Sequence, residues 1–445
     1  MDKKIVGLGV VFVVLLIVLL IILANRNSGS GTSVTVTPTQ SSGQVTLIWW
    51  NLFEPEENVK PLIAAFETKY PNIKIQYTQV GLDGIENYKT ELQNSLTDQD
   101  VVTSPDIFPI HNTWMGKFQN LLVPAPSTVI SSTDMQDFYA IVSKDFLRSQ
   151  KVYALPMSLD AIALIYNKTK LREKGYQAPA LTWNDLKTQA VDLTVRDQIN
   201  NITYAGFSAY DPETSEFYFE VMNQLFLQND VLMVDSTTDL SKIGDNDNAS
   251  SAVSYYRNFL EGFDSTWDPK FKKDIAAFLE NNLAMYPAPS WRLINVLEYN
   301  DYYKLNIDVG VATMPQLTGG GDFYWPTYWG QTVAKDSQYS KEAWQFIEFI
   351  TQPEQLQLYN DTVKANGRPI GIIFPRISQA EINQSDPYLA PYAASLAKAQ
   401  NWDMKDGWEL KKMFDSLFSS NNAGIDAIQG AINKVRQEAT ITPTP

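Results

Sequence analysis

Strand-like and helix-like stretches alternate from residue 45 to residue 110, and this alternation restricts the fold more than any other feature of the sequence. Short apolar stretches predict strands at 45–50, 73–77 and 106–110, and the stretches between them predict helices at about 57–70 and 88–96. Strands that are joined through helices by short connections form a parallel α/β sheet. Ligands of such sheets bind at the carboxyl ends of the strands, so we expect a site near residues 50–54 and 110–114.

The remainder of the chain is long enough for a second lobe. The chain has 445 residues, of which 44% are hydrophobic, and it therefore fits two lobes with packed cores. A mostly helical region precedes two strand-like stretches at 307–314 and 331–334; an amphipathic helix at 342–351 and several more helices follow. This order predicts an α/β protein with two lobes and more than one crossing of the chain between them.

The N-terminal segment predicts a membrane anchor. Residues 5–24 carry no charge, and at about 1.5 Å per residue they span roughly the 30 Å hydrocarbon core of a bilayer. Lys3 and Lys4 precede this segment, so residues 1–4 are expected in the cytoplasm and the body on the extracytoplasmic side of the cell membrane. No clear Ala-x-Ala site follows, which favours an uncleaved single-pass signal anchor; a cleaved signal peptide is the competing interpretation.

Composition excludes several classes of function. A net charge of −15 argues against nucleic acid or an anionic membrane surface as a partner, because both require clusters of Lys and Arg. The chain has no cysteine and one histidine, so it offers no disulfide, no lipid-modified cysteine and no Cys- or His-based zinc site. A phosphate-binding loop of the G-x-x-x-x-G-K-[ST] type is absent as well. We expect no cofactor and no metal.

Residues 156–168, P-M-S-L-D-A-I-A-L-I-Y-N-K, place one carboxylate directly before an apolar stretch. Residues 161–166 have the length and flanks of a buried strand, and a helical stretch at 169–174 follows. A carboxylate at the start of a buried strand costs desolvation energy unless polar groups meet it. Taken alone, Asp160 is better interpreted as a helix cap or as a solvated strand end.

The same segment resembles the lobe-crossing segment of the maltose-binding-protein-like family, the extracellular solute-binding proteins (family 1) of sugar-importing ATP-binding-cassette transporters. Further segments are similar to elements of this family in order and spacing: V-T-L-I-W-W-N at 45–51, F-E-T-K-Y-P-N-I-K-I at 66–75, P-D-I at 105–107, A-M-Y-P-A-P-S-W at 284–291 and G-V-A-T-M-P at 310–315. The resemblance implies a two-lobed periplasmic-binding-protein-like fold of type II with an interlobe ligand cleft.

We expect the following division of the chain. The N-lobe comprises residues 44–158 and 307–350, and the C-lobe comprises residues 159–306 and 351–438. Residues 25–43, rich in Ser, Gly and Thr, are expected to form a flexible linker, and residues 439–445 a disordered tail.

The resemblance also implies roles for particular residues. Asp160 would accept hydrogen bonds from sugar hydroxyls, and Trp291 would present an aromatic face to a pyranose ring. Trp408 stands about where the family places another stacking tryptophan, with Trp402 as its competitor and core packing as the alternative for both. Among some relatives a binding histidine stands at the position of His111, and a structural role is its alternative; Trp114 either lines the cleft or begins a helix.

Two further parts of the sequence are candidates for the cleft. Phe53 and Glu54 stand where maltose-binding protein has Asp-Lys, a departure that argues against maltose itself; Glu54 either binds hydroxyls or is a solvated loop charge. The segment Y-W-P-T-Y-W-G at 324–330 has four aromatic residues, more than one loop needs for packing, which makes Tyr328 and Trp329 candidates.

These features predict a membrane-anchored substrate-binding protein of a carbohydrate ABC importer. It would act as a monomer, close its two lobes on a mono- or oligosaccharide and deliver it to the permease subunits. One alternative is an extracellular glycan-cleaving enzyme in which Asp160 and Glu54 form the pair of carboxylates. Another is the same fold with a non-sugar solute such as a peptide or a polyamine.

Overall fold

The structure is a computed structural model, and it describes residues 43–97, 104–420 and 424–439. The predicted anchor at 5–24, nearly all of the predicted linker and all but the first residue of the predicted tail lie outside the described residues. Among the described helices, none has the length and apolar composition that crossing a bilayer requires. The residues from Val45 onward form one compact unit, and the following description concerns this unit alone.

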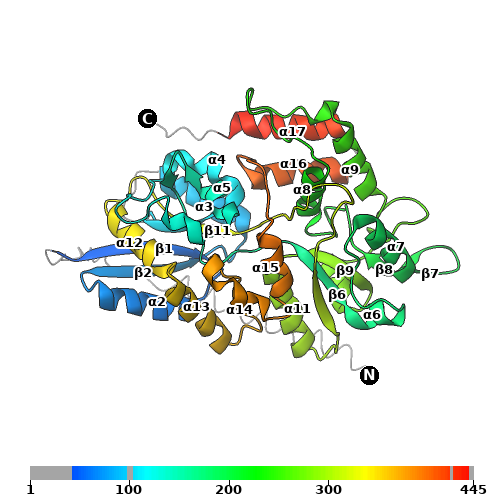
Figure 1. Ribbon diagram of the computed structural model, residues 1–445, viewed down its shortest axis with the longest axis horizontal. Helices are drawn as coiled ribbons and strands as arrows, with labels where there is room; N and C mark the ends of the chain where they lie inside the picture. The colour runs from blue at the N-terminus through cyan, green and yellow to red at the C-terminus, as the bar shows by residue number, and fades with distance from the viewer. Residues whose placement is uncertain (1–42, 98–103, 421–423, 440–445) are drawn as a thin grey trace, which may run out of the picture. The chain divides into compact units, whose positions relative to one another are not determined.

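The first lobe is built on a four-stranded sheet. Its strands, in spatial order, are β11 (Trp329–Val333), β3 (Ile107–His111), β1 (Val45–Leu52) and β2 (Ile73–Val80). β1 pairs in parallel with both β2 and β3, which confirms the parallel sheet that the alternating pattern predicted, and β11 pairs antiparallel with β3. Figure 1 shows α2 (Glu56–Lys69), α12 (Ser340–Ile350) and α13 (Pro353–Ala365) on one side of this sheet and α3 (Ile85–Thr97), α4 (Met115–Phe118) and α5 (Ala140–Phe146) on the other.

The second lobe is built on a five-stranded sheet. Its strands, in spatial order, are β10 (Val309–Thr313), β6 (Ala163–Asn167), β9 (Leu283–Ala288), β8 (Ile202–Phe207) and β7 (Val195–Arg196). Every residue of β6 is buried, as the apolar stretch after Asp160 predicted. The strands β8 and β9 are a finding, because the sequence pattern predicted a mostly helical region before residue 307.

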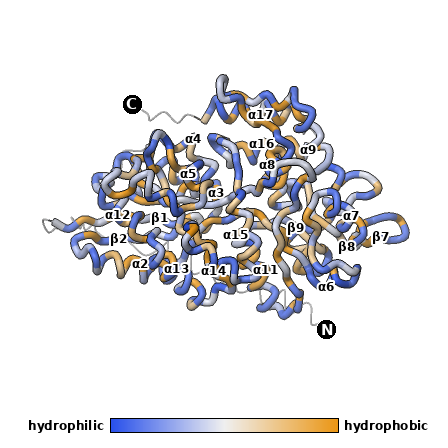
Figure 2. The backbone as a smooth tube through the Cα atoms, viewed as in Figure 1, coloured by the Kyte–Doolittle hydropathy of each residue, from blue (hydrophilic) through white to orange (hydrophobic). Residues whose placement is uncertain are grey.

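Helices of the second lobe surround this sheet. They are α6 (Lys168–Glu173), α7 (Trp183–Leu193), α8 (Tyr218–Gln228), α9 (Asp247–Arg257), α10 (Asp274–Leu279), α11 (Ser290–Tyr302), α15 (Ala390–Leu396), α16 (Gly407–Ser419) and α17 (Ile425–Glu438). A small hairpin of β4 (Leu147–Arg148) and β5 (Lys151–Val152) and the short helix α14 (Ala380–Gln384) lie in the connecting segments. In Figure 2 hydrophobic stretches follow interior strands such as β9, and hydrophilic stretches follow the outer turns.

Two parts of the predicted lobe division are wrong. Residues 307–350 were assigned to the N-lobe, where β11 and α12 do lie, but β10 pairs antiparallel with β6 and therefore completes the sheet of the second lobe. The part from 351 onward was assigned to the C-lobe, but α13 packs against α2 of the first lobe. Both errors have one cause: pairing partners more than a hundred residues away decide to which sheet a segment belongs, and local pattern does not report them.

The start of α16 is fastened to the first lobe. The Asp406 carboxylate is buried and accepts hydrogen bonds from Lys89 of α3, at 2.6 and 2.7 Å, and its Oδ2 lies 2.9 Å from the Lys117 Nζ of α4. Gly116 and Gly407 allow the close approach, since an added Cβ at either position would lie under 3 Å from Lys405 or Thr113. The rest of α16 packs on the second lobe, where Phe414 meets Phe219 of α8.

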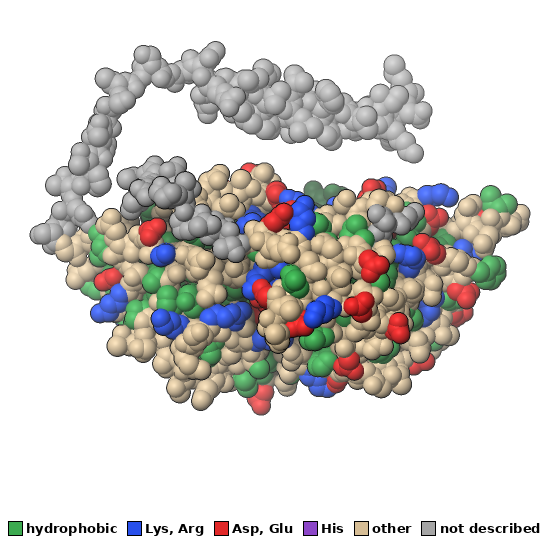
Figure 3. Space-filling model, turned by 90° about the horizontal axis from the view of Figure 1, so that it is seen from above, with side chains coloured by type: hydrophobic (Ala, Val, Ile, Leu, Met, Phe, Trp, Pro, Cys, Tyr) green, Lys and Arg blue, Asp and Glu red, His purple; other side chains and the backbone are tan. Residues whose placement is uncertain are grey.

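Charged side chains are mixed over the surface. On the face that Figure 3 shows, acidic and basic side chains lie interspersed, with basic ones gathered near the middle of the body. Some basic side chains pair with an acidic one, as Lys412 does with Glu86 and Lys411 with Asp415.

Candidate functional site

A cleft of about 1060 Å³ is lined by side chains of both lobes. The ends of β1 and β3 contribute Asn51 to Glu54 and His111, at the carboxyl ends where the sheet pattern predicted a site. We call this side, with Tyr359 and Arg368, the first wall. The second wall comprises Trp291 at the start of α11 and, around the start of α8, the residues Glu216, Phe217, Phe219 and Glu220. Each of the seven predicted site residues contacts this cleft: Glu54, His111, Asp160, Trp291, Tyr328, Trp329 and Trp408.

Asp160 lies between the walls and caps a helix. Its carboxylate accepts hydrogen bonds from the Ser290 backbone N–H, at 3.0 Å, and from the Ser290 hydroxyl, at 2.7 Å. Ser290 begins α11, whose N-cap residue Pro289 offers no side-chain cap, so Asp160 supplies that cap from another element. The Ala161 N–H occupies a further acceptor position at 2.8 Å. The cap interpretation that the residues alone favoured therefore holds, and the helix concerned lies 130 residues away.

Burial sets the protonation of Asp160. The side chain is only 8% exposed, and this burial raises the pKa of the carboxyl to about 7, against the hydrogen bonds from Ser290, which lower it. With most of its acceptor positions used, Asp160 has little capacity left for a ligand. Its clearest effect on the cleft is to fix the first turn of α11, which carries Trp291.

Glu54 is neither a free ligand group nor a solvated loop charge. Its carboxylate accepts hydrogen bonds from Asn58 at 2.5 Å, from the Tyr359 hydroxyl at 2.6 Å and from Arg368 at 3.0 Å to each oxygen. Arg368 and Tyr359 come from segments that follow Glu54 by more than 300 residues. Glu54 and Arg368 form a partly buried ion pair. Both oxygens of the Glu54 carboxylate already accept hydrogen bonds from protein groups.

His111 is held in place through both ring nitrogens. Nδ1 lies 2.8 Å from the Thr113 hydroxyl and Nε2 lies 3.2 Å from the Thr327 hydroxyl. Burial lowers the pKa of the imidazole to about 3, so the ring is neutral at physiological pH. Its ring packs at 5.0 Å against Trp329 and at 6.0 Å against Trp114, which form one aromatic group on the first wall.

Trp291 is the most exposed tryptophan of the cleft. It is 44% exposed, on the second residue of α11. The Arg292 guanidinium lies 4.5 Å from the ring centroid and Phe217 meets the ring edge-on at 5.7 Å. An aromatic ring that is supported from one face and an edge leaves its other face available to an apolar surface of a ligand.

The two late tryptophans differ in environment. Trp408 lines the cleft on α16, is partly buried, and donates its indole N–H to Glu86 of α3. Trp402 is buried in the core of the second lobe and donates to Asn223 at 2.8 Å. Of the two, Trp408 is the one that faces the cleft.

The aromatic segment 324–330 divides between cleft and core. Trp329 is partly exposed and packs on Trp114 and Tyr88. Tyr328 is 2% exposed, and its hydroxyl donates to the buried Asp145 at 2.7 Å. The Tyr328 hydroxyl is thus directed into the first lobe, away from any ligand.

Sequence reasoning missed the acidic groups of the second wall. Glu216 of the segment before α8 pairs with Arg292 through one oxygen, and its Oε2 is buried without a hydrogen-bond partner among the described residues. Glu220 of α8 likewise has a buried, unpartnered Oε2, and burial raises its pKa to about 7, against the attraction of Lys411. Two glutamates four residues apart at a helix start, within E-F-Y-F-E, were the available signal.

Metal chemistry has no support in the described part of the chain. No cluster of three or more His, Asp or Glu side chains there could hold a metal ion. The cleft instead combines aromatic faces with a few polar groups that are buried or held in fixed positions, which suits an uncharged polar ligand.

Comparison with known proteins places the chain in a family. The family model described as bacterial extracellular solute-binding protein matches residues 53–357, more than half of the chain. The chain belongs to this family. The family is a class of binding proteins and not a class of enzymes. The folded body of such an extracellular solute-binding protein lies on the extracytoplasmic side.

Individual relatives agree with this membership. The maltotriose-binding protein of Pyrococcus abyssi is 23% identical over 324 residues, which are 71% of this chain and 64% of the relative's own length. The multiple sugar-binding protein of Streptococcus mutans is 22% identical, over 74% of this chain and 76% of the relative. Among solved structures, the cyclic alpha-maltosyl-1,6-maltose binding protein of Arthrobacter globiformis superposes with a TM-score of 0.70 at 15% identity, covering 89% and 100% of the two chains. This likeness shows the two-lobed α/β fold.

Proposed function

We propose that this protein is the substrate-binding protein of a carbohydrate ABC importer and binds a mono- or oligosaccharide in the interlobe cleft. The observation that carries the proposal is the composition of the cleft, where Trp291 and Trp408 offer ring faces beside buried glutamate oxygens. Sugars present apolar C–H faces and hydroxyl groups at their edges, and this combination matches both. The names of the relatives, a maltotriose-binding and a multiple sugar-binding protein, support the same ligand class.

The walls have different roles in this proposal. Trp291 of the second wall contacts the sugar through its open ring face, and Glu216 and Glu220, which line the cleft beside it, meet hydroxyl groups. Trp329 of the first wall and Trp408 at the start of α16 supply further aromatic surface, and His111 offers a neutral ring to the sugar. Asp160 acts mainly as a positioning residue through the cap of α11, and Glu54 stabilises the base of the first wall.

Binding to both walls would favour closure of the lobes. A ligand shifts a conformational equilibrium only by its difference in affinity for the two states. A sugar that contacts both walls gains contacts when they approach, so it stabilises a closed form. We propose that this closed form brings the sugar to the permease subunits.

The alternative of a glycan-cleaving enzyme is weaker. It requires two carboxylates that flank the scissile bond, and Asp160 and Glu54 were the candidate pair. Glu54 is fully engaged with Arg368, Tyr359 and Asn58, and Asp160 is engaged with Ser290 and Ala161. Neither carboxyl has the freedom to act as nucleophile or base.

We further propose that residues 5–24 anchor the protein in the cell membrane, with the body outside. The supporting observation is the uncharged apolar segment after Lys3 and Lys4. Fractionation of cells that express the full chain should place it in the membrane pellet, with an intact N-terminus. Release of a soluble protein that begins after residue 24 would contradict the anchor and leave the sugar proposal standing.

Isothermal titration of the purified body tests the ligand class. We expect one-to-one binding of at least one saccharide from a panel of mono- and oligosaccharides, and no turnover of it on prolonged incubation. Binding of a peptide or polyamine in place of every saccharide would show that the sugar proposal is wrong. Release of shorter sugars from a bound oligosaccharide would favour the enzyme instead.

A further inference from the structure

One face of α11 continues from the cleft onto the outer surface of the second lobe. Residues 291, 295, 298 and 302 are spaced by four, three and four positions, so they lie in one row along the helix. Trp291, Asn295 and Glu298 line the cleft. Tyr302 ends the row at the C-terminal end of the helix. We call these four residues the α11 row.

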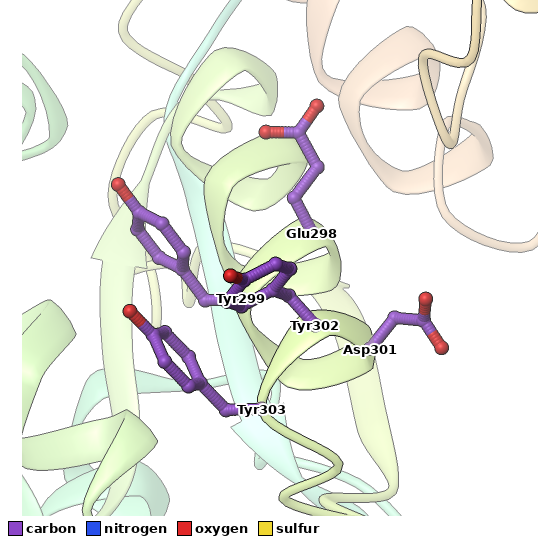
Figure 4. A pocket seen from close by; sticks show the side chains of 5 residues that line it. All are labelled: Glu298, Tyr299, Asp301, Tyr302 and Tyr303. Atoms are coloured by element: carbon purple, nitrogen blue, oxygen red, sulfur yellow. The ribbon is translucent and has the colours of Figure 1, made fainter.

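A depression of about 510 Å³ lies at the outer end of the row. It is lined by Glu298, Tyr299, Asp301, Tyr302 and Tyr303, and Figure 4 shows the three tyrosine rings on one side of the helix and Asp301 on the other. The rings are in contact: Tyr302 and Tyr303 meet edge to face at 4.9 Å, and Tyr299 lies 6.3 Å from Tyr303. Tyr302 is 77% exposed.

Glu298 joins the two places. It lines both the cleft and the tyrosine depression, so the two are neighbouring parts of one continuous surface. Trp291 and Tyr302 are 11 positions apart, which is about 16 Å along a helix at 1.5 Å per residue. That distance corresponds to several linked pyranose rings, and the exposed rings at its two ends are separated by the amide of Asn295 and the carboxylate of Glu298.

We propose that the α11 row is an extended subsite for a linear oligosaccharide that projects out of the cleft. This inference rests on the proposed sugar-binding function and goes beyond it, because it assigns a chain of several sugars and a second stacking residue, Tyr302. One end of the oligosaccharide lies against Trp291 within the cleft. The following units run along α11, where Asn295 and Glu298 meet their hydroxyls, and a distal unit stacks on Tyr302.

The chemistry of the row supports this occupant. Exposed aromatic rings bind C–H faces of sugars at low entropic cost, since a tyrosine has few rotatable bonds. The Asn295 Oδ1 accepts a hydrogen bond from Arg292 at 3.1 Å, so the amide is held in place, and Asn295 and the exposed Glu298 carboxylate suit hydroxyls without full desolvation. Continuity with the cleft distinguishes this patch from isolated exposed aromatic residues such as Phe263, which is 82% exposed elsewhere on the second lobe.

Titration against chain length tests the proposal. The probes are the linear maltodextrins from maltose to maltoheptaose and the linear mannan oligosaccharides from mannobiose to mannohexaose. For a series that binds, affinity should rise with length beyond the shortest bound member. Tyr302→Ala should leave the shortest member unchanged and weaken the longest by roughly three- to tenfold.

Two matched variants sharpen this test. Tyr302→Phe keeps the ring and should retain the gain with length, whereas Phe263→Ala removes an equally exposed aromatic ring away from the row and should change nothing. An identical length dependence in Tyr302→Ala and the unchanged protein overturns the extended subsite while the sugar proposal stands. If neither series binds to the unchanged protein while another saccharide does, the extended subsite is overturned and the sugar proposal stands; if no saccharide binds at all, both fail.

Sedimentation of the same variants examines another occupant of the patch. The extended subsite predicts the same monomer–dimer distribution for Tyr302→Ala and the unchanged protein. A dimer that Tyr302→Ala abolishes, without an effect on long oligosaccharides, would identify the tyrosines as a contact between copies and overturn the proposal.

Discussion

On the first wall of the cleft, the Glu54 carboxylate accepts hydrogen bonds from Asn58, Tyr359 and Arg368, whereas on the second wall Glu216 and Glu220 each keep a buried oxygen without a partner among the described residues. A satisfied buried group stabilises the protein and has little to offer a ligand. An unsatisfied one costs stability until a ligand hydroxyl meets it. We infer that the first wall is a fixed surface, and that the unpartnered oxygens of the second wall lower the stability of the free protein and raise its affinity for a ligand.

The largest expected effect concerns the first wall. Glu54→Ala leaves the partly buried Arg368 without its carboxylate, and we expect the free energy of unfolding to fall by roughly 3 kcal/mol. Urea unfolding of the purified body measures this change. Glu57→Ala, an exposed glutamate on the same side of the cleft, is the control and should stay within about 0.5 kcal/mol of the unchanged protein. Equal stability of both variants would contradict a structural role for Glu54.

The second wall should show its cost in the dependence of stability on pH. The pKa of Glu220 is raised to about 7 in the folded protein, above its unfolded value, so the folded state binds the extra proton between about pH 4.5 and 7. Its contribution to stability is fully present below pH 4.5 and is lost as the pH rises through 7. The contribution of Asp160 to stability also falls as the pH rises, because its pKa is raised in the folded protein. The contribution of His111 rises with pH instead, because its pKa is lowered to about 3.

A difference measurement isolates Glu220 from these other groups. Relative to the unchanged protein, Glu220→Gln should gain on the order of 1–3 kcal/mol in the free energy of unfolding between pH 4.5 and pH 8. The measurement is urea unfolding of both proteins at several pH values. Parallel curves would show that Glu220 does not titrate in this range.

Trp291 should separate affinity from stability. Trp291→Ala removes an exposed ring face and should weaken binding of any saccharide ligand about tenfold, while its melting temperature stays close to that of the unchanged protein. Trp329→Ala, on the first wall, should instead lower the melting temperature, because Trp329 packs against His111 and Trp114. The reverse assignment of the two effects would invalidate the distinction between the walls.

The smallest expected effect decides between the two late tryptophans. Trp402→Phe loses the hydrogen bond to Asn223 in the core and should cost about 1 kcal/mol of stability without a change in affinity. Trp408→Phe, on α16, should change saccharide affinity by a few-fold at most, because a ring face remains. Calorimetric titration and thermal unfolding of both variants provide the two readouts.

Local sequence patterns predicted individual strands and helices but did not predict which strands pair with one another. The apolar stretches predicted β1, β3 and β6, because burial and alternation are properties of a few neighbouring residues. The sheet that receives β10 depends on its pairing with β6, and the sequence pattern does not report this. The predicted N-lobe assignment failed there for that reason.

The site shows the same limit. The resemblance to solute-binding proteins selected seven residues that all line the cleft, but it could not tell which of them have free groups. Whether Glu54 is free depends on Arg368, which follows it by 314 residues, and whether Asp160 is free depends on the first residue of α11. Conversely, Tyr302 was inconspicuous because the sequence does not say which face of a helix meets solvent.

The fastening of α16 has a consequence for any motion of the two lobes. Asp406 forms ion pairs with Lys89 of α3 and Lys117 of α4, and two glycines allow the close approach, so the beginning of α16 is joined to the first lobe. The remaining turns of α16 pack on α8 of the second lobe. If the second lobe rotates, a helix that contacts both lobes in this way would keep its first turn in a constant position relative to the first lobe. Trp408 lies in that first turn, so its ring would keep its position relative to the first wall while the second wall approaches.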